Sequence, residues 1–303
     1  MTQTIQADNG WRVWWQLTRP HTLTAAFAPV FLGTMIAIRD THIDWLLFTA
    51  MLVASLLIQA ATNMFNEYYD FARGLDNENS VGIGGAIVRN GVKPQTVLRL
   101  AFLLYAIAGV IGIYICYQTS WWLLVVGGIA MIIGYLYTGG PYPIAYTPFG
   151  ELFSGLFMGF LIVLIAFYIQ TGTITADSIL LSVPSTLLVA AIMMANNIRD
   201  IVGDAASGRK TLAILAGRSA AVNILLSFFV LSYVWIVILV VFGIITPWAL
   251  LVFLSIKKPV KIINIFKRHT EPLKVMPAMK DTGITNTLFA LLLAIGLLIG
   301  HIF

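Results

Sequence analysis

Residues 63–76, with the sequence NMFNEYYDFARGLD, bring acidic and amide side chains to the end of a long uncharged run. On a helix, Asn63, Glu67 and Asp70 share one face, because spacings of four and seven residues align at 3.6 residues per turn. A third acid, Asp76, follows a glycine that we expect to end the helix. Carboxylates that face one another repel unless a cation lies between them. Oxygen ligands of this kind suit Mg2+, which completes its shell with water and substrate phosphates.

Residues 196–211, NNIRDIVGDAASGRKT, form a second stretch of similar composition after another uncharged run. Asn196, Asp200 and Asp204 are spaced four residues apart, which again places them on one helical face. One such cluster could merely decorate a helix end. Two clusters, each closing an apolar span, indicate two halves of a single site.

Cationic and aromatic residues near these stretches have two interpretations. Arg73, Arg209 and Lys210 would suit a site that binds a metal together with a polyanion, because they neutralise phosphate charge further. Basic residues also flank cytoplasmic helix ends for reasons of topology alone. Arg19 could be a snorkelling anchor at the membrane entrance, and Tyr137 an interfacial aromatic anchor.

The composition indicates that a membrane protein positions these residues. The chain is 59% hydrophobic and 10% charged, with a mean hydropathy of +0.89, whereas soluble domains carry about 25% charged residues. A spanning helix needs about 20 apolar residues, so the two longest uncharged runs must each hold two helices. The uncharged runs are Pro20–Ile38, Trp45–Asn66, Leu100–Gly150, Leu152–Ala176, Ser178–Ile198, Ser219–Ile256 and Thr282–Phe303.

The fold class predicted from these runs is an all-α integral membrane protein with nine transmembrane helices in one bundle. We expect breaks at residues 118–120 and 139–143 in the first long run, and at 243–247 in the second. The eighth span, roughly 248–263, is the shortest. We expect residues 1–303 to form a single polytopic domain.

The distribution of charge predicts the orientation. With nine spans, seventeen of the eighteen Lys and Arg residues fall on the N-terminal side of the membrane, and only Arg39 falls on the other. The positive-inside rule therefore places the N-terminus and both acidic stretches in the cytoplasm and the C-terminus outside. The same distribution explains the net charge of +5 without a nucleic-acid partner. The single cysteine, Cys116, excludes a disulfide and a cysteine-based metal site.

An acidic mouth surrounded by hydrophobic helices favours one reaction class. Metal ions could hold a phosphorylated head while the helices hold a long lipid tail. As a diphosphate leaves, Mg2+ and cationic side chains stabilise its charge, and a dry aromatic cavity shelters the remaining carbocation. The pattern indicates ionisation of an allylic diphosphate, which requires no nucleophilic side chain.

The two stretches resemble the paired aspartate-rich motifs of the UbiA-type intramembrane prenyltransferases. Within that family the chain is most similar to the branch that prenylates 1,4-dihydroxy-2-naphthoate in menaquinone synthesis. The delayed Asp76, and a GGxxV run followed by Arg89, favour this branch over the hydroxybenzoate branch. Glu67 departs from the family pattern, which usually has Asp there. The segments that carry the resemblance over most of the chain are 18–34, 63–76, 84–94, 137–143 and 196–213.

The resemblance implies a nine-helix bundle in a bacterial inner membrane, a cytoplasmic active site and dependence on Mg2+. It implies transfer of a polyprenyl chain from polyprenyl diphosphate to 1,4-dihydroxy-2-naphthoate with loss of carbon dioxide, giving demethylmenaquinone. Membrane lipid would be the other partner. Tyr137 would face the allylic cation, and Arg19 would lie near the acceptor's carboxylate. The implied metal ligands are Glu67, Asp70, Asp76, Asp200 and Asp204, and the implied diphosphate-binding residues are Asn63, Asn66, Arg73, Asn197, Arg209 and Lys210.

Three alternatives stay open from sequence. A UbiA-type enzyme could use another acceptor, such as hydroxybenzoate, homogentisate or haem. An ion-coupled transporter would place its ionisable groups near the midplane on broken helices, whereas these acids lie at helix ends. An alcohol phosphotransferase of phospholipid synthesis also uses membrane-end acids with Mg2+, but its DGxxAR motif is missing from the sequence.

Overall fold

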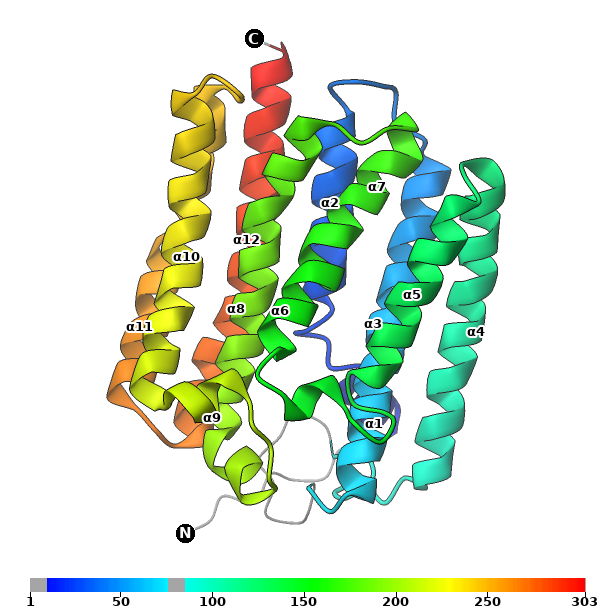
Figure 1. Cartoon of the computed structure of the whole chain (residues 1–303), viewed down its shortest axis with the longest axis vertical. Coiled ribbons are helices and arrows are strands. Elements are labelled where there is room, and N and C mark those ends of the chain that lie inside the picture. The colour runs from blue at the N-terminus through cyan, green and yellow to red at the C-terminus, as the bar shows by residue number, and fades with distance from the viewer. Residues whose placement is uncertain (1–9, 76–84, 303) are drawn as a thin grey trace.

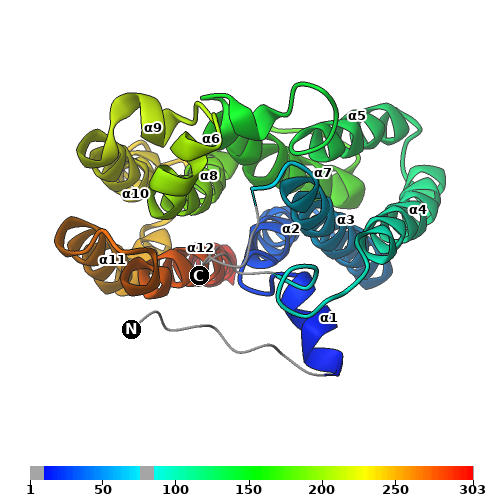
Figure 2. The same ribbon diagram turned by 90° about the horizontal axis from the view of Figure 1, so that it is seen from below.

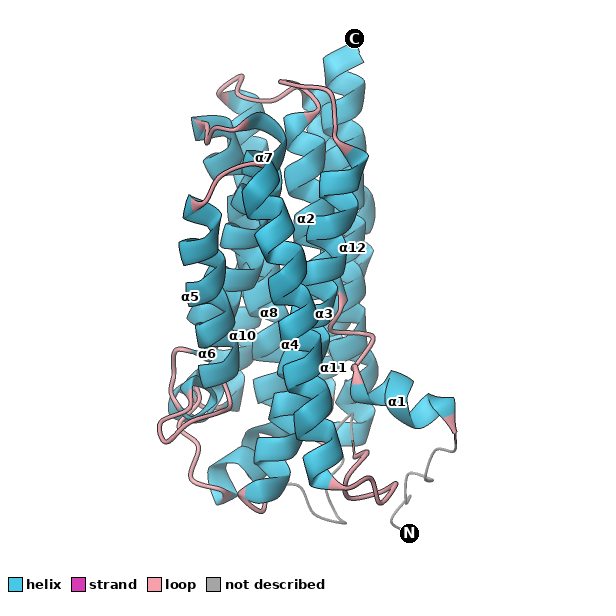
Figure 3. Ribbon diagram, turned by 90° about the vertical axis from the view of Figure 1, so that its right-hand side faces the viewer, coloured by secondary structure: helices cyan, strands magenta, loops and turns pink. Residues whose placement is uncertain are grey.

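The computed structural model describes residues 10–75 and 85–302, and within these residues it contains helices but no strand (Figures 1 and 3). Asp76 lies outside the described residues. The elements are α1 (Trp11–Leu17), α2 (Thr24–Ala37), α3 (Trp45–Ala72), α4 (Pro94–Gln118), α5 (Trp122–Leu136), η1 (Ile144–Tyr146), α6 (Gly150–Ser154), η2 (Gly155–Leu161), α7 (Ile162–Thr171), α8 (Ala176–Ala206), α9 (Leu212–Ala216), α10 (Arg218–Val241), η3 (Pro247–Ser255), α11 (Lys257–Arg268) and α12 (Pro272–Ile302).

Six helices in the described part of the chain are long and apolar enough to cross a membrane: α3, α4, the continuous segment Gly150–Thr171, α8, α10 and α12. Two more apolar helices, α2 and α5, are shorter. The expected eighth span falls on η3, a 3₁₀ helix, which gives way to the α-helix α11 at Ile256. The all-helical membrane fold is confirmed, while the count of nine spans stays a prediction.

Helix ends occur where the breaking residues predicted them. The first long run divides between Gln118 and Trp122, and the second divides between Val241 and Pro247. α3 ends at Ala72, and Gly74 follows with a φ of 73°, a left-handed conformation that costs glycine little. The helix α3 therefore continues past its apolar part, and its C-terminal end carries the first acidic stretch.

The bundle has two flanks joined by α2 and α7. In Figure 2, α3, α4 and α5 lie on one side, α10, α11 and α12 lie on the other, and α2 and α7 lie between them. The larger core contains Phe167, Phe229 and Phe289, all buried. A second core surrounds Phe65, whose ring meets the ring of Tyr105 edge-on, with 5.1 Å between centroids. Edge-on contacts between such aromatic rings add to the apolar burial that the aliphatic side chains of both cores supply.

Small and polar residues allow the closest helix contacts. A Cβ added to Gly159 in η2 would meet the backbone of Thr186 in α8, so only glycine fits there. Asn286 of α12 donates from Nδ2 to the carbonyl oxygen of Thr24 in α2 at 3.2 Å. Contacts between small residues and buried side-chain hydrogen bonds are the usual means by which membrane helices associate.

Helix α1 differs from the others because it lies across the side of the bundle at its lower end (Figure 3). Val13 and Leu17 face the core around Phe65, while Trp11 and Trp15 are exposed. An amphipathic helix with exposed tryptophan is typical of the membrane interface. The chain then turns through residues 18–23 into α2.

Candidate functional site

A cavity of about 400 Å³ is enclosed by α2, α3, α4, α5, the segment Gly150–Thr171 and α8, and its polar and apolar linings separate along its length. Its polar residues come from the ends of α3 and α8 and include Asn63, Asp70, Asp200 and Asp204. Its apolar lining includes Met51, Ala54, Ile115, Leu123, Met158 and Ile192. The cavity therefore combines a charged end, lined by both aspartates and arginines, with an apolar interior, as the sequence predicted.

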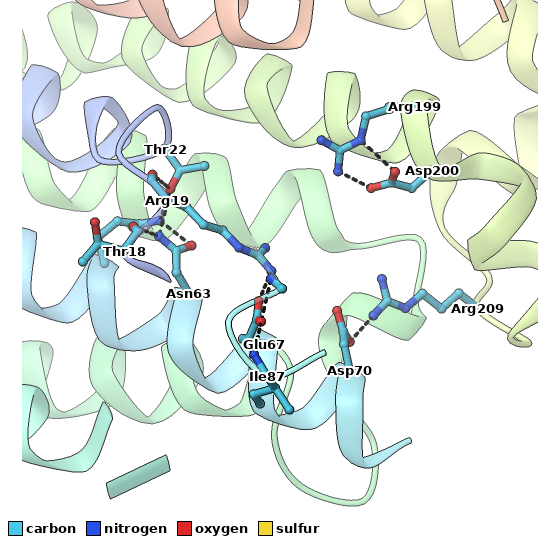
Figure 4. A network of polar contacts seen from close by, with 12 residues as sticks. Thr18, Arg19, Thr22, Asn63, Glu67, Asp70, Ile87, Arg199, Asp200 and Arg209 are labelled. Atoms are coloured by element: carbon cyan, nitrogen blue, oxygen red, sulfur yellow. Dashed lines mark hydrogen bonds and ion pairs between the residues drawn. The ribbon is translucent and has the colours of Figure 1, made fainter. Parts of the chain in front are cut away.

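Arg209 connects the two acidic stretches. Its Nη2 lies 2.5 Å from Oδ1 of Asp70 (Figure 4). Its Nη1 lies 3.0 Å from Oδ1 of Asp204. Both carboxyl groups line the cavity, and their side chains are only 12% and 11% exposed. The prediction that the two stretches meet is therefore supported by direct contacts between them.

The guanidinium group of Arg209 is held on three sides. It lies over the ring of Tyr146, with its Cζ 5.2 Å from the ring centroid. Burial acts to lower its pKa, but the adjacent carboxylates of Asp70 and Asp204 outweigh burial and raise it. Arg209 is therefore a permanent cation in the site. Its Nε is buried without a hydrogen-bond partner, which leaves one donor for a ligand.

Asp200 is paired differently from the other two aspartates. Its carboxylate accepts from Nε and Nη2 of the neighbouring Arg199, and Nη1 of Arg199 contacts Sδ of Met279. Both Arg199 and Asp200 line the cavity. Arg199 was not among the residues selected from the sequence. Its position directly after the uncharged run 178–198 and next to a motif aspartate was the available signal.

Of the two acids of the first stretch that the structure describes, Glu67 is the more deeply buried, with 1% of its surface exposed. Its Oε1 accepts from the backbone N–H groups of Gly85 and Ile87, and its Oε2 lies 3.6 Å from Nη2 of Arg19. Figure 4 draws this contact beside the Asp70–Arg209 pair. Arg19 lines the cavity, whereas Glu67 does not contribute to the lining.

The amide side chains have two kinds of surroundings. Asn63 donates from Nδ2 to the carbonyl oxygen of Thr18 and to Oγ1 of Thr22, so it joins α3 to the turn before α2. Asn197 donates from Nδ2 to Oε1 of Glu151 at 2.8 Å. Both amides, and Asn66, also line the cavity. Oδ1 of Asn63 accepts from Nε2 of Gln59 at 3.4 Å, so the side chain of Asn63 is held by its protein neighbours.

Three other predicted site residues differ in whether they line the cavity. Tyr137 lines the cavity. Arg73 does not, because its Nη1 and Nη2 donate to the carbonyl oxygens of Thr138 and Gly140 and fasten the glycine-rich turn to α3. Lys210 is exposed outside the cavity. The diphosphate roles assigned to Arg73 and Lys210 stay predictions, with no cavity contact to support them.

Among the residues that the structure describes, no three His, Cys, Asp or Glu side chains gather into a preformed metal centre. The donors that are present still fit Mg2+. Asp70 and Asp204 share one cation, and amide oxygens lie in the same cavity, which is an all-oxygen donor set. Mg2+ is usually held by one or two carboxylates, and water and substrate phosphates supply the rest of its shell.

Comparisons with known proteins agree with this geometry. Residues 26–271 match the model of the UbiA prenyltransferase family. The chain is 56% identical over 296 residues to 1,4-dihydroxy-2-naphthoate octaprenyltransferase of Bacillus subtilis (strain 168), covering 98% of this chain and 95% of that protein. It is 27% identical to the protein of the same name from Escherichia coli (strain K12), covering 92% and 94% of the two chains.

Solved structures share the fold. A UbiA homologue from Aeropyrum pernix K1 superposes with a TM-score of 0.69 at 16% identity, covering 92% of this chain and 98% of that one. A UbiA homologue from Archaeoglobus fulgidus, bound to DMAPP and Mg2+, superposes with a TM-score of 0.64 at 17% identity, covering 94% and 99%. The resemblance inferred from the two motifs is thereby confirmed, and the chain belongs to the UbiA prenyltransferase family.

Proposed function

We propose that this protein transfers a polyprenyl group from polyprenyl diphosphate to 1,4-dihydroxy-2-naphthoate in a Mg2+-dependent reaction. The allylic carbon–oxygen bond of the donor breaks, and diphosphate leaves with the bonding electrons. A carbon–carbon bond forms to the naphthoate ring, and the carboxylate leaves as carbon dioxide. The product is the hydroquinone form of demethylmenaquinone.

One observation carries the proposal: the two acidic stretches converge on a single guanidinium group at the polar end of an apolar cavity. A diphosphate needs cations, and an isoprenoid tail needs an apolar space that continues from the same point. The near full-length identity to the Bacillus subtilis naphthoate octaprenyltransferase favours this acceptor over hydroxybenzoate.

Mg2+, when bound with the donor, would neutralise the charge that grows on the departing diphosphate. Asp70, Asp200 and Asp204 are the carboxylates that would hold it, together with the amides of Asn66 and Asn197. Arg209 would add a positive charge beside the diphosphate, because its unpartnered Nε is a free donor.

The cavity walls would protect the allylic cation. Tyr137 presents an aromatic side chain to the cavity, and an aromatic face attracts a cation. The rest of the lining is largely aliphatic, so little water is available to quench the cation before the acceptor does.

The proposed setting is a bacterial inner membrane. The C-terminal ends of α3 and α8, α1 and the basic helix α11 all lie toward the lower end in Figure 1, whereas α12 ends at the upper end. The positive-inside rule supports a cytoplasmic position for the lower end. Both motifs line one cavity, which supports a single functional domain across residues 1–303.

The test is transfer by the purified protein in detergent with radiolabelled octaprenyl diphosphate. Dihydroxynaphthoate and hydroxybenzoate are offered separately, each with Mg2+ or with EDTA. We expect labelled prenylated naphthol only with dihydroxynaphthoate and Mg2+, and release of carbon dioxide in equal amount. Transfer to hydroxybenzoate would contradict the acceptor. Unchanged transfer in EDTA would contradict the metal dependence.

A further inference from the structure

Glu67 differs from Asp70 of the first acidic stretch both in its side chain and in its surroundings. Asp70 faces the cavity, whereas Glu67 is 1% exposed and does not line it. Burying a carboxylate without hydrogen-bond partners costs several kcal/mol of stability. The groups that contact Glu67 therefore indicate its role. Those partners are a turn of the backbone and a cation.

The backbone partners belong to residues 85–92, a turn that packs against α3 and α4. Gly85 and Ile87 donate their N–H groups to Oε1 of Glu67 at 2.7 and 3.4 Å. The turn is also closed by its own hydrogen bonds, and Ala86 and Ile87 are buried against α3 and α4. Gly85 has a φ of 92°, so the conformation that aims its N–H at Glu67 depends on glycine.

The cation is Arg19, in the turn between α1 and α2. Among the described residues, Arg19 is the one non-glycine residue with a positive φ, at 52°. Such a conformation is strained for a long side chain and persists only where the surroundings enforce it. The ion pair with Glu67 at 3.6 Å is one such contact. Arg19 lines the cavity, and its Nε is buried without a hydrogen-bond partner.

We propose that Glu67 is a positioning residue for the acceptor and not a ligand of the metal. Its Oε1 fastens the 85–92 turn to α3, and its Oε2 holds the Arg19 guanidinium against the cavity, where the guanidinium binds the carboxylate of the aromatic acceptor. This proposal deepens the proposed function and rests on it. It also replaces the metal role that the sequence pattern assigned to Glu67.

The expected effect of each Glu67 substitution follows from the contacts of Oε1 and Oε2. Glu67→Gln keeps the shape but removes the charge, and one terminus of the amide becomes a donor that faces either N–H groups or the guanidinium. Glu67→Asp keeps the charge but is shorter by one methylene group, so it cannot reach both partners. Asp281→Asn is the matched control, because Asp281 is also a buried carboxylate, clamped by Lys258 and Lys261 outside the cavity.

The first measurement concerns the metal and needs no turnover. Binding of Mn2+ in the presence of prenyl diphosphate is followed by electron paramagnetic resonance for the wild type, E67Q, D70N and D281N. We expect E67Q and D281N to bind Mn2+ within about twofold of the wild type and D70N to bind at least about tenfold more weakly, which is about 1.4 kcal/mol. If E67Q loses Mn2+ as D70N does, Glu67 is a metal ligand and the proposal is wrong.

The second measurement concerns the acceptor. In steady-state transfer, we expect E67Q to raise the KM for dihydroxynaphthoate about tenfold, with the donor KM and kcat changed less than about threefold. E67D should raise the same KM to an intermediate extent. An unchanged acceptor KM, or an equal rise in the KM of both substrates, would overturn the positioning role.

The third measurement tests the clamp without any substrate. Limited trypsin digestion of the full-length protein in detergent reports cleavage after Arg89, which lies in the clamped turn. We expect faster cleavage in E67Q than in the wild type or D281N. Equal rates would show that Glu67 does not fasten the 85–92 turn.

If no naphthoate is prenylated by the wild type, the proposed function fails, while the trypsin and Mn2+ results still decide the role of Glu67.

Discussion

Asp70 and Asp204 approach the same guanidinium group from different helices, at 2.5 and 3.0 Å from the Nη atoms of Arg209. Without a cation these two buried carboxylates would repel each other. Arg209 thus holds the ends of α3 and α8 together. It also places a positive charge beside the carboxylates that we assign to the metal.

Replacing either aspartate tests whether this cluster performs the reaction. Asp70→Asn and Asp204→Asn keep the side-chain shape but remove the charge that would bind Mg2+. We expect each to lower kcat/KM for prenyl transfer by about 10²- to 10³-fold, a typical loss for one electrostatic contact to a transition state. Steady-state assays with Asp177→Asn as the control check this, because Asp177 pairs with Arg39 on the surface outside the cavity. A loss below about threefold in both variants would exclude a catalytic role.

The Arg209→Lys variant tests whether the site needs only a positive charge at this position or also the planar guanidinium group. Lysine keeps one positive charge but cannot donate to Asp70 and Asp204 from two fixed nitrogens, nor stack its head flat over Tyr146. We expect the KM for the prenyl diphosphate to rise about tenfold while the acceptor KM stays unchanged. Arg39→Lys is the matched control, because Arg39 pairs with Asp177 outside the cavity. Parallel shifts in both KM values would indicate a general loss of structure in place of a lost diphosphate contact.

The apolar part of the cavity predicts which donors are accepted. From Asp70 to Met51 the cavity follows α3 for about 28 Å at 1.5 Å per residue, which suits a long isoprenoid. Gly112 of α4 lines this part, and a Cβ there would meet no atom within 4 Å. We expect Gly112→Leu to fill this space and to lower transfer from octaprenyl diphosphate about tenfold or more, relative to geranyl diphosphate. Competition between the two donors measures the ratio, and Gly112→Ala should leave it near the wild-type value.

The contact between η2 and α8 predicts a stability effect. A Cβ at residue 159 would lie 2.5 Å from Cα of Thr186, a backbone atom that cannot move aside alone. We expect Gly159→Ala to destabilise the protein by about 1–3 kcal/mol, because overpacking forces the backbone to shift. The apparent Tm in detergent should fall. Gly128→Ala is the control, since a Cβ there would meet nothing within 4 Å, and an equal fall in both variants would contradict the explanation.

The helical skeleton was predictable because its signals are local. An uncharged run must be helical in a membrane, and residues such as Gln118 and Gly74 mark where apolar periodicity stops. The meeting of Asp70 with the second stretch was also predictable, since two acidic clusters at apolar helix ends have few other ways to be stabilised.

The partners of individual side chains could not be predicted in the same way. The hydrogen bonds from Gly85 and Ile87 to Glu67 depend on the path of a turn whose sequence has no periodicity. Arg73 bonds to carbonyl oxygens of a turn 65 and 67 residues away, although its position beside acids suggested a diphosphate ligand. Helical spacing identifies the face that a residue occupies, but not which long-range neighbour reaches it.

The hydrogen bond from Asn286 to the carbonyl oxygen of Thr24 has a consequence for biosynthesis. The two residues are 262 positions apart, and they join the first helix of the bundle to the last. At a synthesis rate of 5–20 residues per second, roughly 13–52 s separate their emergence from the ribosome. The short helix α2 must therefore remain in the membrane with an incomplete set of neighbours until α12 inserts beside it. An arrest of translation before α12 would leave α2 without this hydrogen bond.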